Sequence, residues 1–212
     1  MRDIDELVDG YHRFIEQRYP SEAAVYQNLA EKGQSPRTMV IGCCDSRVDP
    51  SAIFNAGPGQ LFVVRNVANL VPPYEPHSDY AGTSAALEFA VTGLNVENIV
   101  VMGHGRCGGI RAFLDGMYER PTKQSFIDRW MSLLRPAHSA ALRDLGTAPI
   151  EVRQVALEHG AIRFSIENLK TFPFIQERVD AGNLRLRGAY FDIADGKLLS
   201  MDPETGQFSQ LD

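Results

Sequence analysis

The chain has 212 residues, with 21 basic and 27 acidic side chains and a formal net charge of −6. This length favours one domain with a sizeable core, and a hydrophobic share of 44% is typical of a globular chain. The acidic balance excludes the broad positive field of a general nucleic-acid binder or of a protein that binds anionic membranes. Three cysteines are too few for a disulfide framework, so we expect reduced thiols.

In the N-terminal part we expect helices and no targeting signal. Residues 1–6 are acidic where a signal peptide needs positive charge, and no run of about 18 apolar residues could cross a membrane. We therefore expect a cytoplasmic protein with no membrane or nucleic-acid partner. Residues 3–18 form a helix with one apolar side, which packs either on the core of this chain or on a second subunit, and residues 21–31 form a second helix.

Three strands follow, at residues 38–41, 61–64 and 98–102. Their apolar residues form continuous runs and do not alternate with polar ones, which is typical of parallel strands buried on both faces. Between the second and the third strand, residues 80–94 have apolar positions at helical spacing, which predicts a helix there.

Helices are expected to dominate from residue 107 to residue 180. One of them has a stripe at helical spacing, formed by Val152, Val155, His159, Ile162, Ile166 and Leu169. Two late strands are expected at 184–192 and 197–201. The alternation of strands and helices predicts one α/β domain over residues 1–212. It would have a mainly parallel central β-sheet flanked by helices, with an N-terminal helical arm and a helical C-terminal region.

Two motifs with reactive side chains come just after the first and the third strand. The second motif is the glycine-rich segment 103–109, which holds His104 and Cys107. In open α/β sheets, ligands bind beyond the carboxyl ends of the strands, so both motifs face one crevice if the two strands are neighbours. The first motif consists of Cys43, Cys44, Asp45, Ser46 and Arg47.

The second motif also matches the glycine pattern of dinucleotide-binding loops, with Gly103, Gly105 and Gly108 between a strand and a helix. Such a site needs an acidic residue about 20 positions further on, at the end of another strand. The segment 119–124 has no strand character. The pattern is therefore weak support for a dinucleotide-dependent oxidoreductase.

A metal site explains more of these residues. Thiolate and imidazole groups are good zinc ligands, and a catalytic zinc ion takes three protein ligands and leaves a fourth position open. His104 and Cys107 are three positions apart at the start of a helix, and either Cys43 or Cys44 would supply the third ligand. Each cysteine alone could be a small buried hydrophobic residue, but this explains poorly why all of them stand near charged residues.

The spacing of Cys43, Asp45 and Arg47, together with that of His104 and Cys107, resembles the zinc-site signature of the β-class carbonic anhydrases. The segments 65–69 and 103–105 are similar to the same family, and the resemblance continues more loosely through 165–169 and 188–192. The chain is more similar to the plant-type branch of this family.

The resemblance implies a carbonic anhydrase, a zinc lyase that reversibly hydrates carbon dioxide to bicarbonate and a proton. One Zn²⁺ per chain would be held by Cys43, His104 and Cys107, with Cys44 as a neighbour that does not bind the metal.

The same resemblance implies two catalytic residues, Asp45 and Arg47, beside the open position of the metal. Zinc-bound hydroxide would attack carbon dioxide, and Asp45 would accept a hydrogen bond that orients this nucleophile. Arg47 would orient Asp45, because its planar guanidinium matches a carboxylate in two hydrogen bonds.

A carbon dioxide pocket and an assembly of subunits are implied as well. The residues at positions that line this pocket in plant-type members are Gln34, Phe62, Val67, Phe89 and Gly108, and Phe89 stands where those members often have tyrosine. The family resemblance implies a homodimer or a larger homo-oligomer, with the helical arm of residues 1–33 as a subunit interface.

Two further functions remain open at this point. A zinc hydrolase of the same fold could act on carbonyl sulfide or carbon disulfide, and access to the pocket would then decide the substrate. A protein that binds metal only for stability would have no use for Asp45 and Arg47.

Overall fold

The computed structural model describes residues 4–77, 81–117 and 125–211. Its internal contacts divide the chain into two compact units, Met1–Ser35 and Pro36–Asp212, which are described one at a time. Tyr80, the first residue of the helix expected over 80–94, and the segment 119–124 lie outside the described residues.

The first unit consists of helices, as expected. Helix α1 (Ile4–Arg13) continues through a π-helical turn (Phe14–Arg18) into α2 (Tyr19–Lys32), so no loop separates the two helices. Pro20 stands in the first turn of α2, and its missing N–H interrupts the hydrogen-bond ladder where the π-helical turn passes into α2. None of the residues of α1 is buried.

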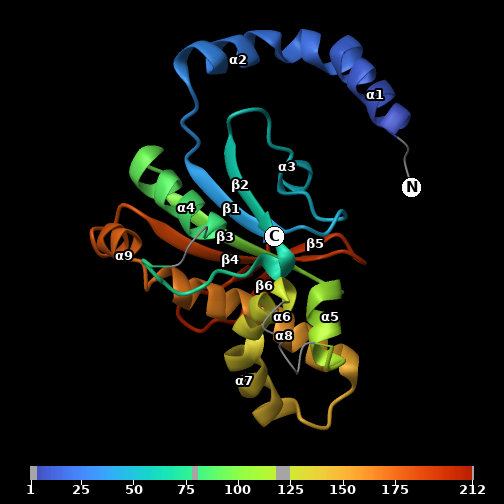
Figure 1. Ribbon diagram of the computed structural model, residues 1–212, viewed down its shortest axis with the longest axis vertical. Helices are drawn as coiled ribbons and strands as arrows, with labels where there is room; N and C mark the ends of the chain where they lie inside the picture. The colour runs from blue at the N-terminus through green and yellow to red at the C-terminus, as the bar shows by residue number, and fades with distance from the viewer. Residues whose placement is uncertain (1–3, 78–80, 118–124, 212) are drawn as a thin grey trace. The chain divides into compact units, whose positions relative to one another are not determined.

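The second unit is built on a six-stranded sheet with the strand order β2-β1-β3-β4-β5-β6 (Figure 1). The strands β1, β2, β3 and β4 are parallel, and β5 and β6 are antiparallel. This confirms the mainly parallel sheet and both late strands, whereas the short β6 is an addition that the sequence pattern does not indicate. The bounds are β1 (Thr38–Cys43), β2 (Leu61–Asn66), β3 (Asn98–His104), β4 (Arg185–Asp192), β5 (Lys197–Met201) and β6 (Phe208–Gln210).

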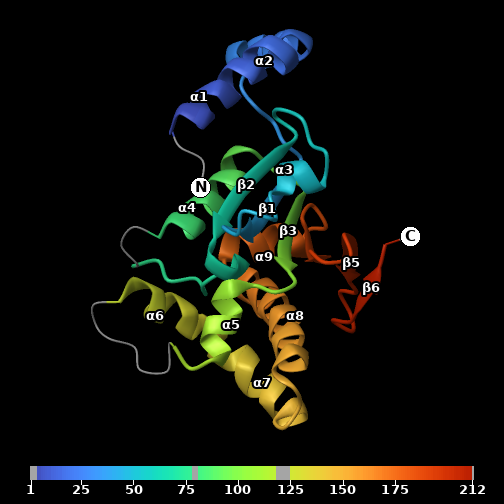
Figure 2. The same ribbon diagram turned by 90° about the vertical axis from the view of Figure 1, so that its right-hand side faces the viewer.

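Helices flank the sheet. The long helix α8 contacts β3, β4, α5 and α7, and Figure 2 shows α5, α7 and α8 together below the strands. Within the described residues, no helix is both long enough and apolar enough to cross a membrane. The helices are α3 (Pro50–Ile53), α4 (Gly82–Glu88), α5 (Gly108–Leu114), α6 (Phe126–Met131), α7 (Arg135–Leu145), α8 (Ile150–Leu169) and α9 (Pro173–Asp180). Shorter turns are π-helical at Phe89–Gly93 and 3-10 helical at Val67–Asn69 and Ser132–Leu134.

The largest core cluster joins the sheet to α4, α8 and α9. Met39 of β1 and Ile99 of β3 belong to it, together with Leu87 of α4, Ile162 of α8 and Ile175 of α9. All five side chains are fully buried, and each such burial contributes roughly 1.5–3 kcal/mol to folding. The core therefore fixes α8 against the strands that end at the two sequence motifs.

Helix α8 differs from the stripe expected for it. Ile162 is buried, whereas Val152 and Val155 are 48% and 43% exposed. The buried face of α8 instead contains several polar residues, which an apolar periodicity assigns to the solvent side. These residues are Gln154, Glu158, Ser165 and Asn168.

Two glycines of the segment 103–109 are explained by close packing. A Cβ atom on Gly103 would lie 2.7 Å from Cδ1 of Ile162, and one on Gly105 would lie 3.0 Å from the hydroxyl oxygen of Tyr190. A side chain at position 103 would therefore push β3 away from α8. Packing therefore accounts for Gly103 and Gly105 without a bound dinucleotide, whereas a Cβ atom on Gly108 would meet nothing within 4 Å among the described residues.

Candidate metal centre

The carboxyl ends of β1 and β3 meet at one edge of the sheet, because the strands are parallel neighbours with Gly42 opposite Met102. β1 ends at Cys43 and β3 at His104, so each strand reaches two residues further than its apolar run indicates. Cys107 stands immediately before α5. The two motifs therefore face one crevice, as the sequence predicts for neighbouring strands.

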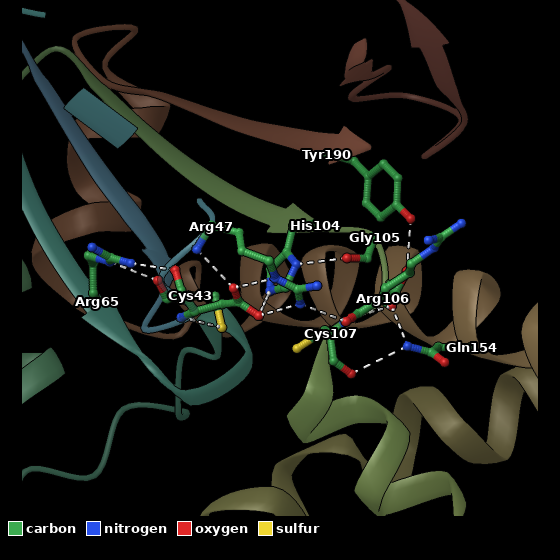
Figure 3. A network of polar contacts seen from close by, with 11 residues as sticks. Cys43, Arg47, Arg65, His104, Gly105, Arg106, Cys107, Gln154 and Tyr190 are labelled. Atoms are coloured by element: carbon green, nitrogen blue, oxygen red, sulfur yellow. Dashed lines mark hydrogen bonds and ion pairs between the residues drawn. The ribbon is translucent and has the colours of Figure 1, made fainter. Parts of the chain in front are cut away.

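Three side chains converge there (Figure 3). The sulfur atoms of Cys43 and Cys107 and a ring nitrogen of His104 all lie within 4.8 Å of one another, and all three residues are buried. Cys44, the alternative third ligand, is exposed and is not part of this group. Two thiols and one imidazole at this separation fit the ligand set of a zinc site with an open fourth position.

The imidazole of His104 has the orientation that a metal ligand needs. Its Nδ1–H donates a hydrogen bond to the carbonyl oxygen of Gly105 at 2.9 Å, so the lone pair of the neutral ring lies on Nε2. Nε2 is buried and has no hydrogen-bond partner among the described residues. Buried polar atoms almost always have a partner, and a metal ion would supply this one.

The two thiols affect each other's ionisation. A hydrogen bond from Cys107 lowers the pKa of Cys43, and the same contact, together with burial, raises the pKa of Cys107. The first proton of such a pair leaves easily and the second is retained, because two adjacent thiolates repel each other. A divalent cation removes this repulsion, so the chemistry of the pair also fits a bound metal.

Asp45 lies beside the three converging side chains and is held by Arg47. The guanidinium of Arg47 donates from Nε to Oδ1 at 2.9 Å and from Nη2 to Oδ2 at 2.7 Å. These hydrogen bonds hold the pKa of Asp45 well below its ordinary value. Oδ2 also lies 3.9 Å from Nε2 of His104, so the carboxylate faces the group that would hold the metal.

Arg65 is a residue of the site that the two motifs do not indicate. From β2, it donates to the carbonyl oxygen of Cys43 at 2.8 Å, to that of Asp45 at 2.6 Å, and to the carboxylate of Asp49 at 3.0 Å. It thereby fixes the backbone on both sides of Cys44. Its position in the segment 65–69, which resembles the family, is the signal that could have identified it.

A second set of residues outside the motifs forms a hydrogen-bonded group that holds the backbone of Cys107. Oε1 of Glu158 accepts hydrogen bonds from the backbone N–H of Cys107 and from the Gln154 amide, both at 2.9 Å. The hydroxyl of Tyr190 donates to Oε2 at 2.8 Å. Burial raises the pKa of the Glu158 carboxyl. Gln154 and Glu158 are part of the polar buried face of α8, which the apolar stripe does not reveal.

The five residues expected to line a substrate pocket occupy different parts of the chain. Val67 follows the end of β2 and packs against the core cluster that contains Cys43 and Cys107, and Gly108 begins α5 directly after Cys107. Phe62 and Phe89 contact each other, with ring centroids 5.8 Å apart. Phe62 lies four residues before the carboxyl end of β2, roughly 13 Å from it. Gln34 belongs to the first unit.

The sequence matches known carbonic anhydrases over most of its length. Residues 38–198 match the model of the carbonic anhydrase family. Beta carbonic anhydrase 3 of Arabidopsis thaliana is 38% identical over 196 residues, which cover 91% of this chain and 74% of that protein. Beta carbonic anhydrase 5, chloroplastic, of the same plant is 40% identical over 192 residues, which cover 91% of this chain and 62% of that protein.

Solved structures agree with this match. The β-carbonic anhydrase CcaA has a TM-score of 0.90 at 30% identity, with 98% of this chain and 99% of that chain covered. One of the tetrameric β-carbonic anhydrases of the ascomycete Sordaria macrospora has a TM-score of 0.81 at 26% identity, covering 97% and 98% of the two chains.

Fold and site together define an α/β protein with a buried Cys-His-Cys group at the carboxyl edge of its parallel strands. The chain belongs to the β-class carbonic anhydrases, enzymes of the carbonate dehydratase class. The plant relatives agree with the expected similarity to the plant-type branch.

Proposed function

We propose that this protein catalyses the reversible hydration of carbon dioxide to bicarbonate and a proton at a zinc centre formed by Cys43, His104 and Cys107. The observation that supports this most strongly is the convergence of three buried donor atoms within 4.8 Å, one of them the unpartnered Nε2 of His104. One zinc ion per chain would supply the Lewis acidity that makes water nucleophilic near neutral pH.

Asp45 has the position of the residue that orients the attacking water. Its Oδ2 faces the three ligand side chains, and the two hydrogen bonds from Arg47 fix the plane of the carboxylate and keep it ionised. An ionised carboxylate accepts a hydrogen bond from water, so the remaining lone pair of the water oxygen is free to attack the carbon atom of carbon dioxide. Arg47 acts through Asp45 as the positioning residue.

Substrate contacts are proposed for five residues, which are two pairs and the single residue Gln34. Val67 and Gly108 stand next to the centre in the same chain and offer the apolar, uncharged surface that carbon dioxide needs. Phe62 and Phe89 lie together away from the carboxyl edge, so we expect them to reach a centre only when a second copy contributes them. Gln34 is assigned to substrate orientation on the family resemblance alone.

A homodimer or larger assembly is part of the proposal, because Phe62 and Phe89 would come from a second copy. A cytoplasmic location stays a prediction, and one relative carries the word chloroplastic in its name.

The proposal is tested by measuring zinc content and the stopped-flow rate of carbon dioxide hydration for wild type and Asp45→Asn. We expect one zinc per chain in both proteins and a loss of about 10²-fold or more in kcat/KM for the variant, since a positioned acceptor for the proton of water contributes that much. Asp115→Asn is the matched control, because Asp115 forms an Arg–Asp pair with Arg111 on the surface of α5. Full activity of Asp45→Asn would contradict the role of Asp45.

A further inference from the structure

Both backbone polar groups of Cys107 are held by side chains of α8. Its N–H donates to Oε1 of Glu158 at 2.9 Å, and its carbonyl oxygen accepts a hydrogen bond from Nε2 of Gln154 at 3.3 Å. Gln154 and Glu158 are one helical turn apart and contact each other, because the same Gln154 amide also donates to Oε1 of Glu158. Two side chains of α8, a helix about 50 residues further along the chain, thus hold the backbone of a candidate metal ligand by hydrogen bonds.

Burial and hydrogen bonds hold the Glu158 side chain in this position. Its exposed fraction is 1%, and its three hydrogen-bond donors come from three different elements: Cys107 beside α5, Gln154 of α8 and Tyr190 of β4. A buried carboxylate is strongly unfavourable unless such donors satisfy it. α8 is itself fixed to β3 by the close contact of Gly103 with Ile162. The carboxylate therefore has one position relative to the strand that carries His104.

The peptide group between Arg106 and Cys107 is also held at both of its ends. Its N–H is the one bound by Glu158, and its carbonyl oxygen accepts a hydrogen bond from Nη2 of Arg47 at 3.2 Å. Arg106 has a φ of 56°, a left-handed conformation that is unfavourable for a residue with a side chain and persists only when its surroundings enforce it. Figure 3 shows Arg47 and Gln154 on opposite sides of this peptide.

We propose that Glu158, supported by Gln154, is a positioning residue of the metal centre: it holds the backbone of Cys107 so that its thiolate points toward Cys43 and His104. This inference rests on the proposed zinc centre. Glu158 does not touch the metal or the substrate in this role. It lowers the freedom of a ligand that stands at the start of a short helix, where the backbone would otherwise be free to rotate.

Because Glu158 would position Cys107 through its hydrogen bonds, we expect a substitution that preserves these bonds to be tolerated. In Glu158→Gln, the remaining oxygen can accept from both Cys107 and Gln154, and the new amide can donate to the hydroxyl oxygen of Tyr190. All three contacts are preserved while the negative charge is lost. In Glu158→Ala, the N–H of Cys107 is left buried without a partner.

The test measures zinc affinity of the holoprotein by competition with a chromophoric chelator, and the visible spectrum after replacement of zinc by cobalt(II). We expect Glu158→Ala to weaken zinc binding about 10–100-fold and to change the thiolate-to-cobalt absorption. Glu158→Gln should retain the affinity and the spectrum of wild type. Asn168→Ala is the control, because Asn168 is another buried polar residue of α8 that bonds the carbonyl oxygen of Val71, away from Cys107. It should lower stability and leave zinc affinity unchanged.

Wild-type zinc affinity and cobalt spectrum in Glu158→Ala would overturn the proposal, as would a loss in Glu158→Gln equal to that in Glu158→Ala. If Glu158→Ala does not fold, Gln154→Leu replaces it and should weaken zinc binding while Glu158→Gln does not. A wild-type protein that binds no zinc would instead overturn the proposed function itself, so the two failures are distinguishable.

Discussion

At the scale of single residues, the site distinguishes side chains that are neighbours in sequence. Cys43 ends β1 with its side chain buried in the Cys-His-Cys group, while Cys44, one position later, is exposed. Cys43 is the last residue of β1 and Cys44 follows it outside the strand, so the end of the strand separates a buried cysteine from an exposed one. Arg65 reinforces this choice by fixing the carbonyl groups of Cys43 and Asp45.

Serine substitution of each cysteine tests this distinction. We expect Cys43→Ser and Cys107→Ser to lose most of their zinc and their activity, because a hydroxyl is a poor zinc ligand in place of a thiolate. Cys44→Ser is the matched control and should keep one zinc per chain, as measured by elemental analysis of the purified proteins. Loss of zinc from Cys44→Ser, with zinc retained in Cys43→Ser, would show that the ligand is the other cysteine.

The candidate ligands could be predicted from the sequence, but the residues that support them could not. Cys43, His104 and Cys107 stand in short motifs after apolar runs, where residue type and spacing are themselves informative. Glu158 reaches the site through the packing of α8, and nothing in its own neighbourhood of the sequence indicates it. Tyr190 of β4 stands in the segment 188–192, which resembles the family loosely, but that likeness does not indicate its contact with Glu158. Their role follows from hydrogen bonds between residues that are distant in sequence.

At the scale of elements, the contact between β3 and α8 determines where the centre forms. The sequence predicts both elements from their apolar residues, yet the face that α8 turns inward includes Glu158 and Gln154 while Val152 and Val155 are exposed. The periodicity is correct for Ile162, Ile166 and Leu169, and misleading about two and three turns before Ile162. A prediction from apolar periodicity misses buried polar residues, because their burial depends on hydrogen-bond partners elsewhere in the fold.

The closeness of this contact predicts the effect of Gly103→Ala. Its Cβ would stand 2.7 Å from Ile162, so we expect the variant to lose about 1–3 kcal/mol of unfolding free energy in urea denaturation. Gly82→Ala at the start of α4 is the control, because its Cβ meets nothing within 4 Å in the part of the chain that the structure describes. That variant should be neutral or up to about 1 kcal/mol more stable. Equal effects of the two substitutions would contradict the packing explanation of Gly103.

At the scale of the whole molecule, the first unit has an apolar surface that its own residues leave uncovered. Leu7 and Tyr11 of α1 are each 59% exposed and stand one helical turn apart. Large apolar side chains gathered on one helix face are typical of an interface. The homo-oligomer, with the arm of residues 1–33 as its interface, stays a prediction that this exposed face supports. The single domain over residues 1–212 stays a prediction as well.

Charged substitutions on this face test the interface. We expect wild type to be at least a dimer in multi-angle light scattering, and the double variant Leu7→Glu/Tyr11→Glu to shift toward the monomer mass of 23.5 kDa. The cause is that a carboxylate buried in an apolar interface has a large desolvation penalty. Arg13→Gln, also on α1, alters one charge outside this pair and should leave the mass unchanged. An unchanged mass of the double variant would exclude this face as the interface.

The zinc centre is tested most directly by the rate of carbon dioxide hydration by the purified protein at three stages: as isolated, after removal of zinc with a chelator, and after zinc is returned. We predict a high rate, then the uncatalysed background, then recovery to the initial rate at one zinc per chain. A rate that persists without zinc, or a protein with one zinc per chain that does not exceed the background, would contradict the assignment of carbon dioxide hydration to the group of Cys43, His104 and Cys107.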